Sequence, residues 1–325
     1  MAGSGPEHDL SSNTKAQAPA PPQVFVLCGP TGVGKTEVAV ALARKHSLHL
    51  VSADSRQVYS WLDIGTAKPG PDLRKEIGIY MVDMVEPSRS YSAADYARDA
   101  LAVMRRLERE GRRFIVVGGS GLYLRALFEP LFDAPRPGPE LRRRLESLSA
   151  AESFEQLRRV DPERAAQLHP NDRQRIMRAL EIFELTGKTT RELARTQKPV
   201  AEYVPAYAVL TMKREDMNRQ IDSRFDAMMA AGLLDEVKEL KQAGFGRSSY
   251  VANAYGYAEL LACLDGELTL EAAVAQAKAK TRAYAKRQLT WFRGLKDARW
   301  FEHTDVETTA RRLEPLLLEV LGPGA

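Results

Sequence analysis

The feature that most constrains the fold is a phosphate loop close to the N-terminus. Residues 29–36 read Gly-Pro-Thr-Gly-Val-Gly-Lys-Thr and fit the pattern G-x-x-x-x-G-K-T at every position. An apolar run over 24–28 precedes the loop and a helical pattern over 37–45 follows it, which is the context that gives the motif its meaning. A glycine turn without a ligand is the alternative, and this context makes it the weaker one. The loop therefore predicts a polyphosphate site.

The physical basis of that site is a row of backbone N–H groups at the positive end of a helix, which together attract an anion. The lysine neutralises the terminal phosphate and the threonine hydroxyl can bind Mg²⁺. The predicted phosphate ligands are Gly29, Pro30, Thr31, Gly32, Val33, Gly34, Lys35 and Thr36, and the predicted metal ligand is Thr36.

The rest of the chain alternates apolar runs with helical patterns, as an α/β protein does. Further strands are expected at 48–52, 114–117 and 207–211, and an amphipathic helix at about 93–110. This alternation predicts a P-loop parallel sheet covered by helices on both faces. We expect a disordered tail over 1–22, a catalytic core over 23–134 plus 205–325 with helices over 215–297, and a helical insert over 135–204.

Composition excludes several classes of protein. The chain has 325 residues, 44% of them hydrophobic and 28% charged, which is typical of a globular protein with a sizeable core. Because it lacks an apolar run of membrane-spanning length and its first 22 residues lack the apolar part of a secretory signal, we expect a cytoplasmic protein without a membrane span. With only Cys28 and Cys263, and histidines without ligand spacing, no structural metal is expected.

Two further strand ends carry polar residues. Asp54 follows the strand at 48–52, and Ser120 lies in the sequence Gly-Gly-Ser-Gly after the strand at 114–117. Carboxyl ends of parallel strands meet in one crevice, so both side chains are expected to face the phosphate loop. The alternative for Asp54 is that it only caps a helix or stabilises a turn. The alternative for the segment around Ser120 is a tight turn without a chemical role. Because the strand at 114–117 does not end in the carboxylate that P-loop ATPases use, a transferase or kinase is favoured over a hydrolytic motor.

The C-terminal part is locally basic. Residues 278–299 contain eight Lys or Arg against a single acid, although the net charge of the whole chain is only +4. Lys278, Arg282, Lys286 and Arg293 recur at helical spacing and form one stripe, which suits phosphate contacts; a solvated face is the alternative. Tyr284 and Trp291, seven residues apart on another face, are expected in the core.

Six motifs in order resemble the family of tRNA dimethylallyltransferases, also called tRNA isopentenyltransferases. The resemblance covers about residues 23–303 and is carried by the phosphate loop together with Ser-Ala-Asp-Ser-Arg-Gln-Val-Tyr at 52–59, Asp-Ile-Gly-Thr-Ala-Lys-Pro at 63–69, Gly-Gly-Ser-Gly-Leu-Tyr at 118–123, Arg-Ala-Leu-Glu at 178–181 and Lys-Arg-Gln-Leu-Thr-Trp-Phe-Arg at 286–293. Six motifs are specific, whereas the phosphate loop alone indicates only a phosphate.

The resemblance implies transfer of a dimethylallyl group from dimethylallyl diphosphate to N6 of adenine 37 in tRNA, with Mg²⁺, by an enzyme of the bacterial type that we expect to be a monomer. It implies that the phosphate loop holds a leaving diphosphate, that Asp54 acts as base for the adenine amine, and that Lys35, Ser120 and Arg224 assist catalysis. It also implies that the insert binds tRNA. The implied tRNA contacts are Asp54, Ser55, Arg56, Gln57, Ser120, Arg142, Gln174, Arg175, Ile176, Met177, Arg178, Asn253, Tyr257, Lys286, Arg287, Gln288, Trp291 and Arg293.

Two departures from the family pattern concern tRNA contacts rather than the chemistry: Ala258 stands where a basic residue is expected, and Tyr80 stands where a histidine is usual. Ser120 stands where the family usually has threonine, and this substitution retains the hydroxyl that the resemblance implies for the reacting centre. Two other functions use the same residues: a small-molecule P-loop kinase, and an RNA-binding protein gated by a nucleotide.

Overall fold

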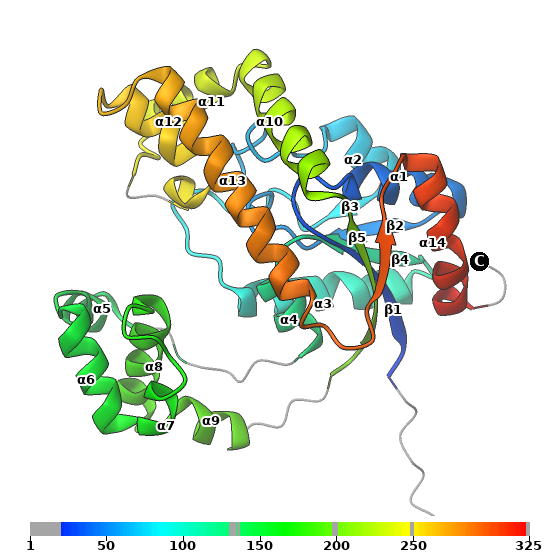
Figure 1. Cartoon of the computed structure of the whole chain (residues 1–325). Helices are drawn as coiled ribbons and strands as arrows, with labels where there is room; N and C mark the ends of the chain where they lie inside the picture. Colours follow the sequence, from blue (N-terminus) through cyan, green and yellow to red (C-terminus); the bar gives the residue numbers. More distant parts are fainter. Residues whose placement is uncertain (1–20, 130–134, 136, 197–200, 248–249, 323–325) are drawn as a thin grey trace, which may run out of the picture.

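The computed structural model describes residues 21–129, 135, 137–196, 201–247 and 250–322. Its centre is a six-stranded sheet in the order β3-β2-β4-β1-β5-β6, in which every neighbouring pair is parallel (Figure 1). The strands are β1 (Gln23–Cys28), β2 (His49–Ser52), β3 (Ile79–Tyr80), β4 (Phe114–Gly118), β5 (Val204–Thr211) and β6 (Arg299–Glu302). The predicted parallel α/β fold is confirmed.

Both faces of the sheet are apolar because side chains alternate along each strand. On β1, Val24, Val26 and Cys28 enter one hydrophobic cluster, whereas Phe25 and Leu27 enter the other. Helices α3 (Ala93–Arg109) and α4 (Gly121–Phe128) cover the first face, and α1 (Lys35–His46) and α14 (Val306–Leu321) cover the second. The short α2 (Pro71–Ile77) packs beside β3.

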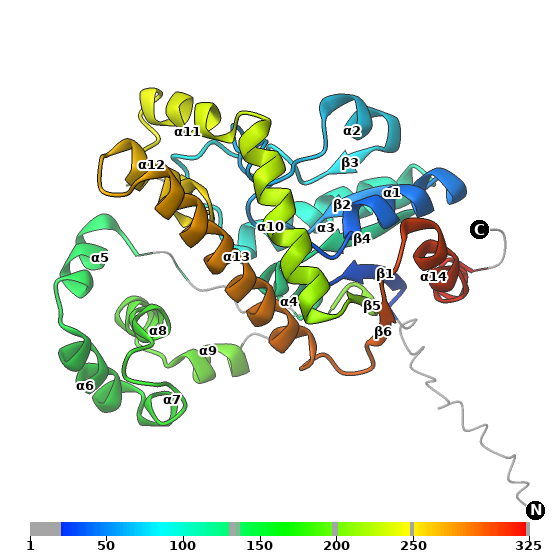
Figure 2. The same ribbon diagram turned by 45° about the horizontal axis from the view of Figure 1, so that its top comes forward.

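Four C-terminal helices form what we call the helical cover: α10 (Arg214–Ala230), α11 (Leu233–Gln242), α12 (Tyr257–Leu264) and α13 (Leu270–Phe292), with a 3₁₀ turn over Tyr250–Asn253. Their apolar side chains join the cluster on the α3 side, and α13 also touches α4. Gly232 and Gly256 precede α11 and α12 with positive φ, and Gly244 follows α11, so glycines separate the helices of the cover. The cover lies over one edge of the sheet (Figure 2).

The segment between α4 and β5 is helical and packs mainly on itself. It contains α5 (Pro139–Glu146), α6 (Ala150–Val160), α7 (Pro162–Ala165), α8 (Arg173–Thr186) and α9 (Thr190–Thr196). Helices α5 to α8 share a small core around Leu157 and Leu180, and α9 packs against α8. Figure 1 shows these helices set to one side of the sheet, beyond α13. Most of the proline-rich connector and part of the break before β5 lie outside the described residues, and β5 begins at Val204, inside the range predicted for the insert.

Five elements escaped prediction: α2, β3, α4, β6 and α14. The exposed sequence Arg-Trp-Phe-Glu of β6 has no clear alternation, and the strand exists because β5 offers it a pairing edge. Residues 1–20 of the tail predicted over 1–22 lie outside the described part of the chain. Among the helices that are described, none combines the length and the apolar character that crossing a bilayer requires.

Candidate active site

The phosphate loop connects β1 to α1 in a conformation that only glycine adopts easily. Gly34 precedes α1 with φ of 83°, and a Cβ atom there would lie 2.8 Å from Nε2 of His303. A Cβ atom on Gly32, with φ of 80°, would lie 2.8 Å from Cγ1 of Ile221 on α10. The loop is therefore enclosed between the helical cover and the end of β6, with its amides at the N-terminus of α1.

Lys35 is held inside this loop beside two other charges. Its Nζ donates a hydrogen bond to the carbonyl of Pro30 at 2.6 Å. Burial lowers the pKa of Lys35 from 10.5 to about 8; the charge of Asp54 opposes this shift and that of Arg224 adds to it. Solvent reaches Arg224 within the cavity, yet the protein around the guanidinium lowers its pKa by desolvation. The charges of Asp54 and Glu37 act on both cations, and yet burial still lowers both pKa values, so a bound anion would stabilise the charged forms.

The ends of β2 and β4 are tied together beside the phosphate loop. Oδ1 of Asp54 accepts hydrogen bonds from the backbone N–H groups of Arg56 at 2.8 Å and Gln57 at 3.3 Å. Ser120 is buried, and its Oγ accepts a hydrogen bond from the N–H of Ser55 at 2.9 Å while donating to Ser55 Oγ at 3.2 Å. Asp54 thus has the turn geometry considered as its alternative role, and it also faces the cavity.

Lys35, Arg224 and Asp54 line one cavity of about 660 Å³ between the sheet and the helical cover. Ser120, which was expected to face the phosphate loop, is not among the lining residues: its hydroxyl is buried and bonds to Ser55. One wall carries Lys35 and Thr36 from the first turn of α1 and Asp54 from the loop after β2, and the opposite wall carries residues from α10 and α13. Phe225 and Met228 from α10 make part of that wall apolar. Charged groups beside an apolar surface suit a ligand with a phosphate head and a hydrocarbon tail.

Gln288 occupies a place that the sequence did not suggest. It was expected to contact tRNA, but its side chain is buried. Its Oε1 accepts a hydrogen bond from the N–H of Thr31 at 2.9 Å, and its Nε2 donates to the carbonyl of Gly119 at 2.8 Å. Helix α13 thereby joins the phosphate loop to the end of β4. Tyr284, one turn earlier, lines the cavity, where burial raises its pKa to about 12.

The predicted basic stripe on α13 is divided. Lys278 pairs with Asp226 and Arg282 with Asp222, so its first half faces α10. The second half is exposed: Lys286, Arg287 and Arg293.

The aromatic residues of α13 differ in surroundings. The Arg287 guanidinium lies over the rings of Tyr255 and Tyr284, at 5.9 and 5.8 Å from their centroids. Trp291 is partly buried against the core, as predicted from its spacing, and packs so closely on Gly121 that a Cβ atom there would lie 2.4 Å from the indole.

The predicted tRNA contacts on the insert fall into two groups. Arg142, Gln174 and Arg175 are exposed, and Arg178 is half-buried against Glu181. Ile176 and Met177 occupy the apolar face of α8 and are buried in the core of the insert, so their side chains do not face a ligand, and those two predictions are corrected.

Of the remaining predicted contacts, Tyr257 is fully buried and donates a hydrogen bond from its hydroxyl to Glu236, so it too faces no ligand. The side chain of Asn253 lies outside the described part of the chain.

The residues present fit a Mg²⁺ ion that is held jointly by the protein and by the oxygens of a bound diphosphate. Thr36 lies in the first turn of α1 and lines the cavity. Across the described residues, three or more His, Cys, Asp or Glu side chains do not gather in a metal-binding group. Mg²⁺ usually keeps several waters and is held by one or two protein oxygens together with substrate phosphates, which is the arrangement that a single threonine allows.

His303 is a cavity residue that sequence reasoning missed. It follows β6, where it meets the phosphate loop at Gly34, and its Nδ1 lies 2.9 Å from Oγ1 of Thr309. Burial lowers the pKa of His303. Because β6 was not predicted, nothing in the sequence placed this histidine at a strand end.

A parallel sheet with a phosphate loop after the inner strand β1, with Ser120 after the adjacent strand β4 and Asp54 after β2, the next strand along, defines a P-loop α/β enzyme. The model of the IPP transferase family matches residues 57–295. The chain is 42% identical to tRNA dimethylallyltransferase 1 of Citrifermentans bemidjiense over 283 residues, covering 86% of this chain and 92% of the relative. It is 40% identical to tRNA dimethylallyltransferase of Anoxybacillus flavithermus, covering 92% and 96%.

Solved structures agree. A tRNA isopentenylpyrophosphate transferase from Bacillus halodurans matches with a TM-score of 0.69 and 34% identity, over 92% of this chain and 96% of that one. A eukaryotic dimethylallyltransferase acting on tRNA matches with a TM-score of 0.78 and 29% identity, over 91% and 78%. The chain therefore belongs to the IPP transferase family of tRNA dimethylallyltransferases.

Proposed function

We propose that this enzyme transfers a dimethylallyl group from dimethylallyl diphosphate to N6 of adenine 37 in tRNA, releasing diphosphate. The observation that carries the proposal is the meeting of a diphosphate site and a carboxylate in one cavity: Lys35, Arg224 and Asp54 all line it. Family membership supports tRNA as the acceptor, since relatives with 40–42% identity are named tRNA dimethylallyltransferases.

The chemistry assigns a role to each wall of the cavity. The donor diphosphate binds the phosphate-loop amides with Lys35 and Arg224, and its allylic chain lies towards Phe225 and Met228. N6 of adenine attacks C1 of the chain while the bond between C1 and the diphosphate oxygen breaks. Asp54 accepts the proton that N6 loses. Negative charge develops on the leaving oxygen, where the two cations stabilise it most.

Mg²⁺, when bound by Thr36 and the diphosphate, supplies further neutralisation of the leaving group. The adenine amine is otherwise hidden in the stacked anticodon loop, so the base is turned out to reach Asp54. We infer that the exposed Lys286, Arg287 and Arg293 of α13, with the arginines of the insert, hold the tRNA backbone. We further propose that the enzyme acts as a monomer in the cytoplasm, where its tRNA substrate would be met.

A labelling experiment tests the proposal. The protein is incubated with Mg²⁺, unmodified tRNA and either dimethylallyl diphosphate labelled in its allylic chain or ATP labelled in its terminal phosphate. We expect allylic label in tRNA, and digestion of that tRNA should give N6-dimethylallyladenosine at position 37. Transfer of labelled phosphate would instead indicate a kinase, and absence of both transfers would indicate a binding protein.

A further inference from the structure

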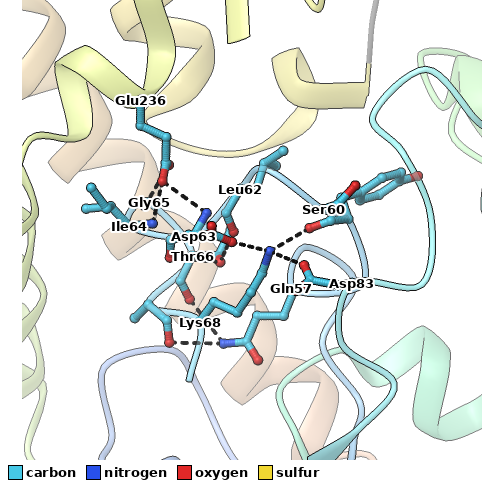
Figure 3. Close-up of polar contacts among 12 residues, drawn as sticks. Gln57, Ser60, Leu62, Asp63, Ile64, Gly65, Thr66, Lys68, Asp83 and Glu236 are labelled. Atoms are coloured by element: carbon cyan, nitrogen blue, oxygen red, sulfur yellow. Dashed lines mark hydrogen bonds and ion pairs between the residues drawn. The ribbon is translucent and has the colours of Figure 1, made fainter. Parts of the chain in front are cut away.

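Glu236 does not line the cavity, but it binds the backbone of a loop that does. It is on α11 in the helical cover, and its carboxylate points to the loop over residues 62–67 (Figure 3). Oε2 accepts hydrogen bonds from the N–H groups of Asp63 at 3.1 Å and Ile64 at 2.7 Å. Oε1 accepts from the N–H of Gly65 at 3.3 Å and from the hydroxyl of Tyr257 at 2.6 Å.

Three consecutive amides that converge on one point form an anion nest. Here the anion is the protein's own carboxylate, so this nest is already filled and does not compete with the phosphate loop for diphosphate. Gly65 is needed because a Cβ atom there would lie 2.5 Å from the ring of Tyr257. Glu236 and Tyr257 together clamp the loop from the side of the cover.

The other end of the same loop reaches Asp54. Nε2 of Gln57, a buried residue, donates to the carbonyls of Thr66 at 3.1 Å and Ala67 at 3.3 Å. The backbone N–H of Gln57 donates to Oδ1 of Asp54 at 3.3 Å. A continuous path of hydrogen bonds and backbone therefore leads from Glu236 through the loop and Gln57 to the carboxylate of Asp54.

The loop has a separate anchor on the sheet side. Nζ of Lys68 contacts the carbonyl of Tyr59 at 2.8 Å and the carboxylates of Asp63 at 2.5 Å and Asp83 at 2.6 Å, and the side chain of Lys68 is only 2% exposed. Lys68 therefore holds the loop to Tyr59 and to Asp83, which follows β3, without help from the cover. The hydrogen bonds from the loop to Glu236 fix where the helical cover sits relative to the loop. This matters for the site because Gly65, Thr66 and Ala67 line the cavity together with Asp54.

We propose that Glu236 is a positioning residue for the transfer reaction: by filling the amide nest at residues 63–65 it couples the helical cover to the loop, and through Gln57 it sets the direction of the Asp54 carboxylate. The proposal rests on the proposed function of Asp54 as base. A displacement of about 1 Å at a reacting group costs on the order of a hundredfold in rate, so a residue without substrate contact can control turnover in this way.

The experiment compares Glu236→Ala and Glu236→Gln with Glu239→Gln, an exposed glutamate on the same helix, as control. Single-turnover transfer is measured at saturating tRNA and donor, and the Kd values for tRNA and inorganic diphosphate are measured separately. We expect Glu236→Ala to lower the transfer rate by about tenfold to a hundredfold. Both Kd values should stay within about threefold of the wild type, because the contact does not touch either ligand. Glu236→Gln keeps one oxygen acceptor and should recover part of the loss, and Glu239→Gln should match the wild type.

A double-mutant cycle separates positioning from a general effect on folding. If Glu236 acts through Asp54, the Glu236→Gln change should have no further effect on the residual rate of Asp54→Ala. Additive losses, or an unchanged rate in Glu236→Ala, would overturn the proposal. If Glu236→Ala does not fold, Tyr257→Phe removes one donor from the same carboxylate and should lower the rate by about twofold to fivefold, and an unchanged rate there would also overturn it. Failure of the proposed function is distinct, since the wild type itself would then transfer nothing.

Discussion

The depressed pKa of Lys35 predicts opposite effects of pH on ligand affinity and on stability. In the free protein, burial holds this pKa at about 8 instead of 10.5. A bound diphosphate favours the ammonium form and raises the pKa again. Diphosphate affinity should therefore fall as pH rises through 8, by about tenfold per pH unit, which gives about thirtyfold at pH 9.5.

The stability of the free protein should change in the other direction. Between pH 8 and 10.5 the unfolded chain keeps the proton on Lys35 and the folded protein gives it up, so the free energy of unfolding rises with pH. The ammonium group costs folding stability at every pH below 8, and that cost is removed progressively up to 10.5. The total is at most about 3.5 kcal/mol, since one pKa unit corresponds to about 1.4 kcal/mol and the shift is from 10.5 to about 8.

The assay is calorimetric titration of inorganic diphosphate with Mg²⁺ between pH 7 and 9.5, for the wild type and for Lys35→Met. Ionisation of the ligand is the same in both titrations, so the ratio of the two Kd values isolates Lys35. Urea unfolding of both proteins over the same pH range measures how the free energy of unfolding changes with pH. A Kd ratio that is constant over the range would refute the reasoning, because it would show that Lys35 does not lose its proton there.

Three further predictions concern other residues of the site. Asp54→Ala should lower transfer by about three orders of magnitude yet leave tRNA binding near the wild type, measured by single-turnover transfer and filter binding; comparable turnover would exclude the role as base. Gln288→Met keeps the volume but removes both buried hydrogen bonds, so we expect a loss of about 1–3 kcal/mol in thermal unfolding and weaker diphosphate binding, whereas an unchanged affinity would show that Thr31 needs no support. Arg287→Ala should weaken tRNA binding and reduce its salt dependence without changing diphosphate affinity, and equal salt slopes would exclude a phosphate contact.

The sheet could be predicted because its signals are local. The apolar runs before the phosphate loop, before Asp54 and before Gly118 correspond to β1, β2 and β4, and the ends of these strands meet as expected for parallel strands. Strand β6 was missed because its pairing with β5 depends on a partner far away in the sequence. His303 was missed for the same reason, since its place beside Gly34 follows from that pairing.

The sequence by itself determined the parallel α/β class, the phosphate loop and the residues at the strand ends, because the spacing of a motif and the alternation of a strand are short-range properties. Only the tertiary structure decided what faces the loop. Buried Gln288 on α13 binds Thr31 across 257 positions of sequence, and Glu236 binds Ile64 across 172. A helix pattern shows which residues share a face, but it does not show which other segment that face meets, since this is settled by how the whole core packs. The loop that indicated a phosphate at the outset is therefore complete only with residues from the far end of the chain.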